Sequence, residues 1–85
     1  MGYTEIYTKS YCPYCHRAKE LLSIKGIPFV EYDVTKDADL EKIMRDRAGQ
    51  NTVPQIFIDG RHIGGCDELF ALDKEGNLDP ILGQA

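Results

Sequence analysis

In the first part of the chain, two segments with the residue pattern of a strand flank one segment with the apolar spacing of a helix. Residues 3–8 are rich in aromatic and β-branched side chains, which predicts a strand. Pro13 suits the first turn of a helix, and apolar residues then recur at helical spacing, so we expect a helix over about 13–25. Residues 28–34 have the composition of a second strand. A strand, a helix and a strand in this order predict a right-handed parallel crossover.

The middle of the chain has the pattern of an amphipathic helix. Asp37 can cap its start and Gly49 can end it. Between them, Leu40, Ile43 and Met44 fall on one side of the helix, and polar residues cover the other side. We therefore expect these three side chains to form the buried stripe of this helix.

The last part of the chain predicts a hairpin and a third helix. Two short runs, 55–58 and 61–63, flank an Asp-Gly pair at 59–60, which is a strong short-range signal for a hairpin. Two glycines then interrupt the chain, and apolar spacing favours a helix over about 66–75. The short apolar tail at 78–82 should pack back on the body of the protein.

The order of these elements predicts an α/β protein with a thioredoxin-like fold, in which two parallel strands and a hairpin share one small sheet with helices on its faces. A chain of 85 residues has room for one domain, which we expect to span residues 1–85. Its 42% apolar and 28% charged residues are close to globular averages. We expect a monomer.

Charge and apolar content also exclude some partners and locations. The net charge is −4 and the basic residues are scattered, which argues against a nucleic-acid partner. No apolar run is long enough to span a bilayer, and the first ten residues do not have the pattern of a secretory signal. We therefore expect no membrane partner and a location in the cytoplasm.

Cysteine usage points to redox chemistry. The three cysteines are too few for the disulfide framework of a small secreted protein, and two of them form the motif Cys12-Pro13-Tyr14-Cys15. A Cys-x-x-Cys that opens a helix within a βαβ unit is typical of thiol–disulfide exchange. Free N–H groups and the positive end of the helix dipole favour a thiolate at Cys12, which is therefore the expected nucleophile, with Lys9 close by. Cys15 lies one turn further along the same face and should resolve mixed disulfides.

Two other interpretations of these cysteines remain open at this point. One is half of a zinc site, which Cys66 with His62 or His16 would have to complete. The sequence has no second paired motif, so we expect no bound metal. The other is a purely structural disulfide, but a loop this short constrains the unfolded chain only weakly.

Two further segments have functional as well as purely local interpretations. Thr52-Val53-Pro54 marks the start of a strand, and a cis bond before Pro54 would leave the Val53 N–H and C=O unpaired for a substrate backbone. The segment 64–67, Gly-Gly-Cys-Asp, is locally a helix cap with a small buried thiol. Its functional interpretation is an anion site, where helix N–H groups hold a carboxylate and Asp67 accepts from an α-amino group.

Taken together, the motifs at 12–15, 52–58 and 63–69 resemble those of the dithiol glutaredoxins, closest to the short bacterial glutaredoxin three type. The resemblance covers essentially the whole chain. It implies a four-stranded mixed sheet with three flanking helices in the order βαβαββα. It also implies a glutathione-dependent thiol–disulfide oxidoreductase with no tightly bound cofactor and with glutathione as the reducing co-substrate.

The same resemblance implies a set of glutathione contacts: Lys9, Tyr14, Thr52, Val53, Pro54, Gly65, Cys66 and Asp67. Within that set, Val53 would pair with the cysteinyl backbone, and Cys66 and Asp67 would receive the γ-glutamyl end. The family commonly has an arginine just before the Thr-Val-Pro motif, whereas this chain has Gln50-Asn51. The glycyl carboxylate would then be held by Lys9 alone or by a cation of the second helix, such as Lys42 or Arg45.

The implied substrates are disulfide-containing and glutathionylated proteins, with ribonucleotide reductase as a candidate. Two rival functions belong to other classes. One is a thioredoxin-type carrier recycled by a flavoprotein reductase, although the chain has no tryptophan and so lacks the usual thioredoxin motif. The other is an iron–sulfur cluster carrier, against which Pro13 and Cys15 argue.

Overall fold

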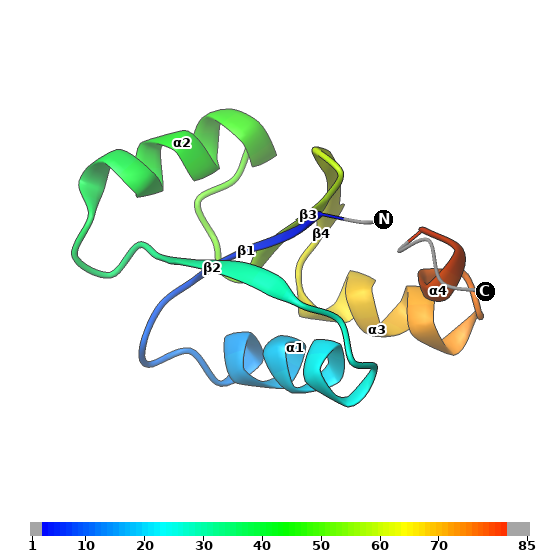
Figure 1. Cartoon of the computed structure of the whole chain (residues 1–85). Helices are drawn as coiled ribbons and strands as arrows, with labels where there is room; N and C mark the ends of the chain where they lie inside the picture. Colours follow the sequence, from blue (N-terminus) through cyan, green and yellow to red (C-terminus); the bar gives the residue numbers. More distant parts are fainter. Residues whose placement is uncertain (1–2, 82–85) are drawn as a thin grey trace.

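The chain forms a sheet of four strands covered by helices, as the sequence predicts (Figure 1). The computed structural model describes residues 3–81. The strands are β1 (Thr4–Thr8), β2 (Phe29–Asp33), β3 (Gln55–Ile58) and β4 (Arg61–Gly64). The helices are α1 (Pro13–Ile24), α2 (Ala38–Ala48), α3 (Cys66–Lys74) and the short α4 (Leu78–Ile81).

The sheet is mixed, with the strand order β2-β1-β3-β4. β1 and β2 pair in parallel, which confirms the predicted crossover through α1, and the remaining pairs are antiparallel. The β3–β4 hairpin turns at Asp59 and Gly60, whose φ angles are 53° and 79°. Two successive positive φ angles give the turn that matches the twist of paired strands, so the Asp-Gly signal is confirmed.

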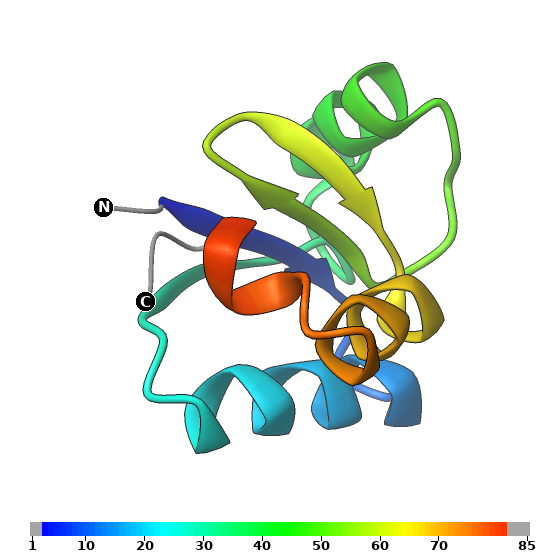
Figure 2. The same cartoon turned by 90° about the vertical axis from the view of Figure 1, so that its right-hand side faces the viewer.

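Helices cover both faces of the sheet. α1 and α3 lie on one face and α2 on the other (Figures 1 and 2). Side chains alternate along each strand, so Ile6 and Ile56 join the core under α1 and α3, whereas Tyr7 and Phe57 join the core under α2. The start of α1, the loop after α2 and the start of α3 meet at one end of the sheet, and this arrangement creates the candidate site.

The expected buried stripe of α2 is only partly correct. Met44 is fully buried, but Ile43 is 46% exposed. Leu40, Met44 and Ala48 pack on the sheet at intervals of four residues, and Ile43 lies beside this row rather than in it. The ends of the helix are as predicted, because Asp37 accepts a hydrogen bond from the Leu40 N–H at 3.0 Å and Gly49 has a φ of 71°.

The apolar tail forms the short helix α4, and Leu78 is fully buried in the core under α1 and α3. Leu82, at the end of the predicted tail, is outside the described residues. Within residues 3–81, none of the helices has both the length and the apolar character needed to cross a membrane.

Candidate active site

Cys12 is held at the start of α1 by the loop that leaves β1. The Ser10 N–H donates to Thr35 Oγ1 at 3.0 Å, and the Cys12 N–H donates to the Lys9 carbonyl at 3.2 Å. Cys12 is the N-cap of α1, and its Sγ accepts a hydrogen bond from the Cys15 N–H at 3.3 Å. This bond places the Cys12 sulfur, as an acceptor, at the positive end of the helix dipole.

Cys15 has a very different environment, although it is only one turn away. Its side chain is fully buried on the inner face of α1. Burial raises the pKa of the Cys15 thiol to about 12, and the hydrogen bond with Cys12 acts in the same direction. Cys15 is therefore protonated at neutral pH.

The Val53–Pro54 peptide is cis and lies opposite Cys12. The Cys12 thiol donates to the Val53 carbonyl oxygen at 3.7 Å, so the expectation that this carbonyl is unpaired is wrong. The reason is proximity, because the loop brings the carbonyl within reach of the thiol itself. The Val53 N–H has no hydrogen-bond partner among residues 3–81.

The start of α3 packs tightly against this loop. A Cβ added at Gly65 would be 3.3 Å from the Pro54 carbonyl oxygen, so glycine permits this close approach. The Gly65 N–H donates to the Glu68 carboxylate at 2.6 Å. Glu68, rather than Asp67, therefore supplies the cap of α3. The first helical bond is from the Leu69 N–H, and the N–H groups of Cys66 and Asp67 have no partner among residues 3–81.

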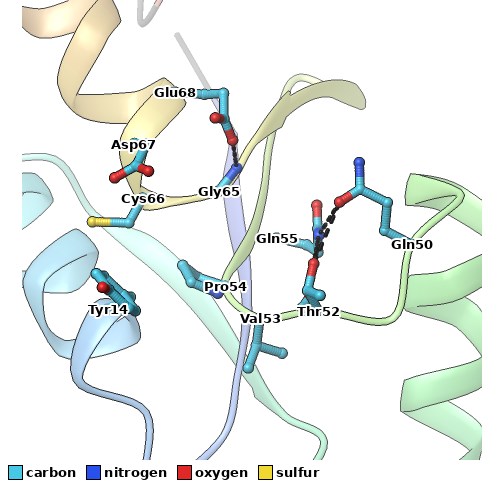
Figure 3. A pocket seen from close by; sticks show the side chains of 10 residues that line it. All are labelled: Tyr14, Gln50, Thr52, Val53, Pro54, Gln55, Gly65, Cys66, Asp67 and Glu68. Atoms are coloured by element: carbon cyan, nitrogen blue, oxygen red, sulfur yellow. Dashed lines mark hydrogen bonds between the residues drawn. The ribbon is translucent and has the colours of Figure 1, made fainter.

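A cavity of about 180 Å³ lies between these segments (Figure 3). Its lining residues are Tyr14, Gln50, Thr52, Val53, Pro54, Gln55, Gly65, Cys66, Asp67 and Glu68. Seven of the eight expected contact residues are in this set, and Lys9 is not. Lys9 instead contributes its carbonyl to the turn that positions Cys12.

Three lining residues were not among the expected contacts: Gln50, Gln55 and Glu68. Gln55 lies in a strand and is only 2% exposed, and the sequence gives no sign that this polar residue is buried. Glu68 could have been found, because an acidic residue three positions after a helix cap is a known N-terminal signal.

The cavity has an acidic end and no basic lining residue. Asp67 and Glu68 line it at the start of α3, whereas Lys42 and Arg45 of α2 do not reach it. Lys42 is directed to Asp46, at 3.4 Å. Burial raises the pKa of the Cys66 thiol, so Cys66 contributes a neutral wall. Within residues 3–81, no cluster of acidic, histidine and cysteine side chains has the makeup of a metal site.

A family model and a sequence relative both indicate the same family for this chain. Residues 4–63 match the family model described as Glutaredoxin. The chain is 58% identical over 82 residues to Glutaredoxin 3 of Escherichia coli strain K12, an alignment that covers 96% of this chain and 99% of that protein.

Two solved structures have the same fold. The crystal structure of a buckwheat glutaredoxin–glutathione complex superposes with a TM-score of 0.88 at 33% identity, over 96% of this chain and 77% of that one. The solution structure of a glutaredoxin from Brucella melitensis superposes with a TM-score of 0.83 at 49% identity, over 98% of this chain and 92% of that one.

Proposed function

Because the chain belongs to the glutaredoxin family, and is therefore a thiol–disulfide oxidoreductase, we propose that it works with glutathione as its reductant and with Cys12 as its nucleophile. The observation that carries this proposal is the environment of the Cys12 sulfur. It accepts the Cys15 N–H at the start of α1 and faces the Val53 carbonyl, which lines the cavity. A nucleophile and a ligand cavity thus adjoin each other.

In the proposed one-thiol route, the Cys12 thiolate attacks the glutathione sulfur of a mixed disulfide. The Cys12–glutathione bond forms, the substrate–glutathione bond breaks, and the substrate leaves as a thiolate that takes up a proton. A second glutathione thiolate then attacks the bound glutathione sulfur. This step releases oxidised glutathione and restores the Cys12 thiolate, so no metal or nucleotide is needed.

In the proposed two-thiol route, Cys12 attacks a protein disulfide and Cys15 resolves the mixed species. Cys15 must first lose its proton, which its high pKa opposes, chiefly through burial and then through the hydrogen bond with Cys12. Once Cys12 is in a disulfide, that hydrogen bond no longer has a thiolate partner, and the adjacent Cys15 thiol is at high effective concentration. Cys15 attacks the Cys12 sulfur, the bond to the substrate breaks, and the substrate leaves as a thiolate that takes up a proton. Two molecules of glutathione then reduce the internal Cys12–Cys15 disulfide and leave as oxidised glutathione.

We propose that glutathione binds along the cavity from α3 to the loop after α2. The open N–H groups of Cys66 and Asp67 suit the α-carboxylate of the γ-glutamyl end, and the Asp67 carboxylate suits its ammonium group. The free Val53 N–H suits the cysteinyl carbonyl. Tyr14, Thr52, Pro54 and Gly65 complete the walls.

The glycyl carboxylate requires a hydrogen-bond donor, and none of the described residues that line the cavity is a cation. Gln50 lines the loop end, and its Oε1 is occupied by contacts with Thr52 and Gln55. Its amide nitrogen is therefore the group left to donate. We propose this neutral donor in place of Lys9, Lys42 or Arg45.

The remaining parts of the proposal concern the setting of the reaction. We propose that its partners are disulfide-containing and glutathionylated proteins, with ribonucleotide reductase as a candidate. We also propose that the protein is a monomer with one domain over residues 1–85. A reducing compartment such as the cytoplasm keeps its thiols ready to react.

A pair of assays on Cys15→Ser tests the proposal. With a glutathionylated small thiol, the variant should match or exceed the wild type, because that route needs only Cys12 and glutathione. With a disulfide-bonded protein, it should be much slower, because external glutathione must replace the internal resolving step. Cys12→Ser is the matched control and should be inactive in both assays.

The opposite result would separate this function from its nearest rival. If Cys15→Ser were inactive on the glutathionylated thiol while the wild type was active on protein disulfides, the one-thiol route would be wrong. A dithiol carrier reduced by a flavoprotein reductase would then be the better assignment.

A further inference from the structure

The loop that faces Cys12 has few bonds of its own. Residues 50–54 connect α2 to β3 and supply Gln50, Thr52, Val53 and Pro54 to the cavity. They make no backbone–backbone hydrogen bond with any residue in the described range. Irregular backbone of this kind has to be fixed by side chains if it is to present a defined surface to a ligand.

One buried side chain does most of this fixing. Gln55, at the start of β3, is 2% exposed, and its Nε2 contacts the Thr52 carbonyl at 3.0 Å and Thr52 Oγ1 at 3.1 Å. The same nitrogen is 3.4 Å from Gln50 Oε1 (Figure 3). All three neighbours accept hydrogen bonds, so the nitrogen of the Gln55 amide must be on this side.

The other end of the Gln55 amide is held by β4. Gln55 Oε1 is 2.7 Å from Nε2 of His62. Because Oε1 can only accept, the His62 nitrogen is the donor. The His62 ring packs against Phe57, with 5.0 Å between the ring centroids, and Phe57 is fully buried in the sheet. His62 thus connects the rigid hairpin to the loop through Gln55.

We propose that His62 and Gln55 are positioning residues for the ligand site, which hold Thr52 and Gln50 in the orientation that binds glutathione. Neither residue touches the reacting sulfur. Without the His62 donor, Gln55 Oε1 loses its partner, and the side chain then moves to find another one, which draws its nitrogen away from Thr52. The loop would lose its defined shape although the sheet beneath it stays intact. This inference rests on the proposed function, because glutathione is the ligand whose binding it explains.

Steady-state kinetics with a glutathionylated small thiol tests the proposal. His62→Phe keeps a ring on Phe57 and removes the donor, and it should raise the KM for that substrate about three- to fivefold with kcat changed less than about twofold. Gln55→Met removes both ends of the connection and should raise KM about tenfold. His62→Gln can offer an amide N–H at a similar reach and should restore KM to near the wild-type value. Arg61→Gln, on the same strand, is the matched control.

Each outcome decides the question. A KM that rises in His62→Phe and returns in His62→Gln, with melting temperatures that stay close together, supports positioning. An unchanged KM with a lower kcat and a lower melting temperature means that the pair only stabilises the fold, and this overturns the proposal. If Gln55→Met does not fold, the His62 variants still decide. A wild type that fails to reduce the substrate with glutathione would instead refute the proposed function.

Discussion

Polar groups differ between two regions of the molecule: the face of the sheet under α2, and the end of the sheet where Cys12 lies. Under α2, four residues form what we call the α2 network: Glu5, Tyr7, Tyr32 and Arg47. Arg47 makes a two-point pair with the Glu5 carboxylate at 2.9 and 3.2 Å, and it donates to the Tyr7 hydroxyl at 2.8 Å. Tyr32 donates to the same carboxylate at 2.9 Å. Each of these four groups has its partner inside the protein.

At the end of the sheet, the site around Cys12 leaves several backbone N–H groups open. The Val53 N–H and the N–H groups at the start of α3 have no partner among residues 3–81. These open donors lie beside Cys12, and under the proposed function a bound ligand would complete their hydrogen bonds. Substitutions in the α2 network should therefore lower the stability of the fold with little effect on activity. Substitutions in the Cys12 site should lower activity with little effect on stability.

The largest expected effect comes from breaking the α2 network. Arg47→Met leaves Glu5, which is 7% exposed, without its cation. Removing one partner of a buried pair is strongly destabilising, and we expect a loss of about 2–4 kcal/mol because Arg47 is partly exposed. Urea denaturation measures this loss. Activity per folded molecule should stay close to that of the wild type.

A matched control comes from an exposed ion pair. Lys42 and Asp46 are 3.4 Å apart on the surface of α2, at 71% and 69% side-chain exposure. Lys42→Met should change stability by less than about 0.5 kcal/mol. Equal losses in the two variants would contradict the special role of the α2 network.

A smaller effect should appear as pH dependence. Arg47, through its hydrogen bonds, holds the pKa of the Glu5 carboxyl below its ordinary value of 4.5. A carboxyl with a depressed pKa in the folded state stabilises the fold above its unfolded value, and that contribution is lost as the pH falls through the folded value. Glu5→Gln should therefore be less stable than the wild type at pH 7, and the gap should narrow below pH 4.5. A gap that stays constant down to pH 3 would rule out this linkage.

The smallest expected effect is at the edge of the Cys12 site. Asp67→Asn keeps the shape of the side chain and removes the charge proposed to bind the ligand ammonium group. We expect the KM for glutathione to rise about fivefold, which corresponds to one exposed hydrogen bond to a charged group. The melting temperature should hardly change, because Glu68 rather than Asp67 caps α3. A large stability loss with an unchanged KM would show that Asp67 caps α3 and does not bind the ligand.

The elements with strong local signals could be predicted from the sequence. The Asp59-Gly60 turn and the caps of α2 rest on the conformational preferences of single residues, so no tertiary information is needed. The redox motif at the start of α1 is equally local. These features predict the parallel β1–β2 pair and the β3–β4 hairpin, and the long-range pairing of β1 with β3 joins the two into one sheet.

Features that depend on contacts distant in sequence could not be predicted. Glu5 and Arg47 are 42 positions apart, and nothing in either neighbourhood indicates the other. The Gln55–His62 bond requires the register of the hairpin, and the exposure of Ile43 depends on how α2 sits on the sheet. The resemblance to the family implies Lys9 as a cavity residue, but the structure uses the Lys9 backbone in the turn before Cys12 instead.

Competitive alkylation of the reduced wild type tests the central claim, that Cys12 is reactive while its neighbours are not. Iodoacetamide is added at pH 7, and mass spectrometry follows the modification of each cysteine over time. Cys12 should react first, with Cys15 and Cys66 slower by at least about 100-fold, because only a thiolate is nucleophilic and burial keeps the other two protonated. In urea the three rates should become similar. A Cys15 that reacts as fast as Cys12 in the folded protein would contradict the account.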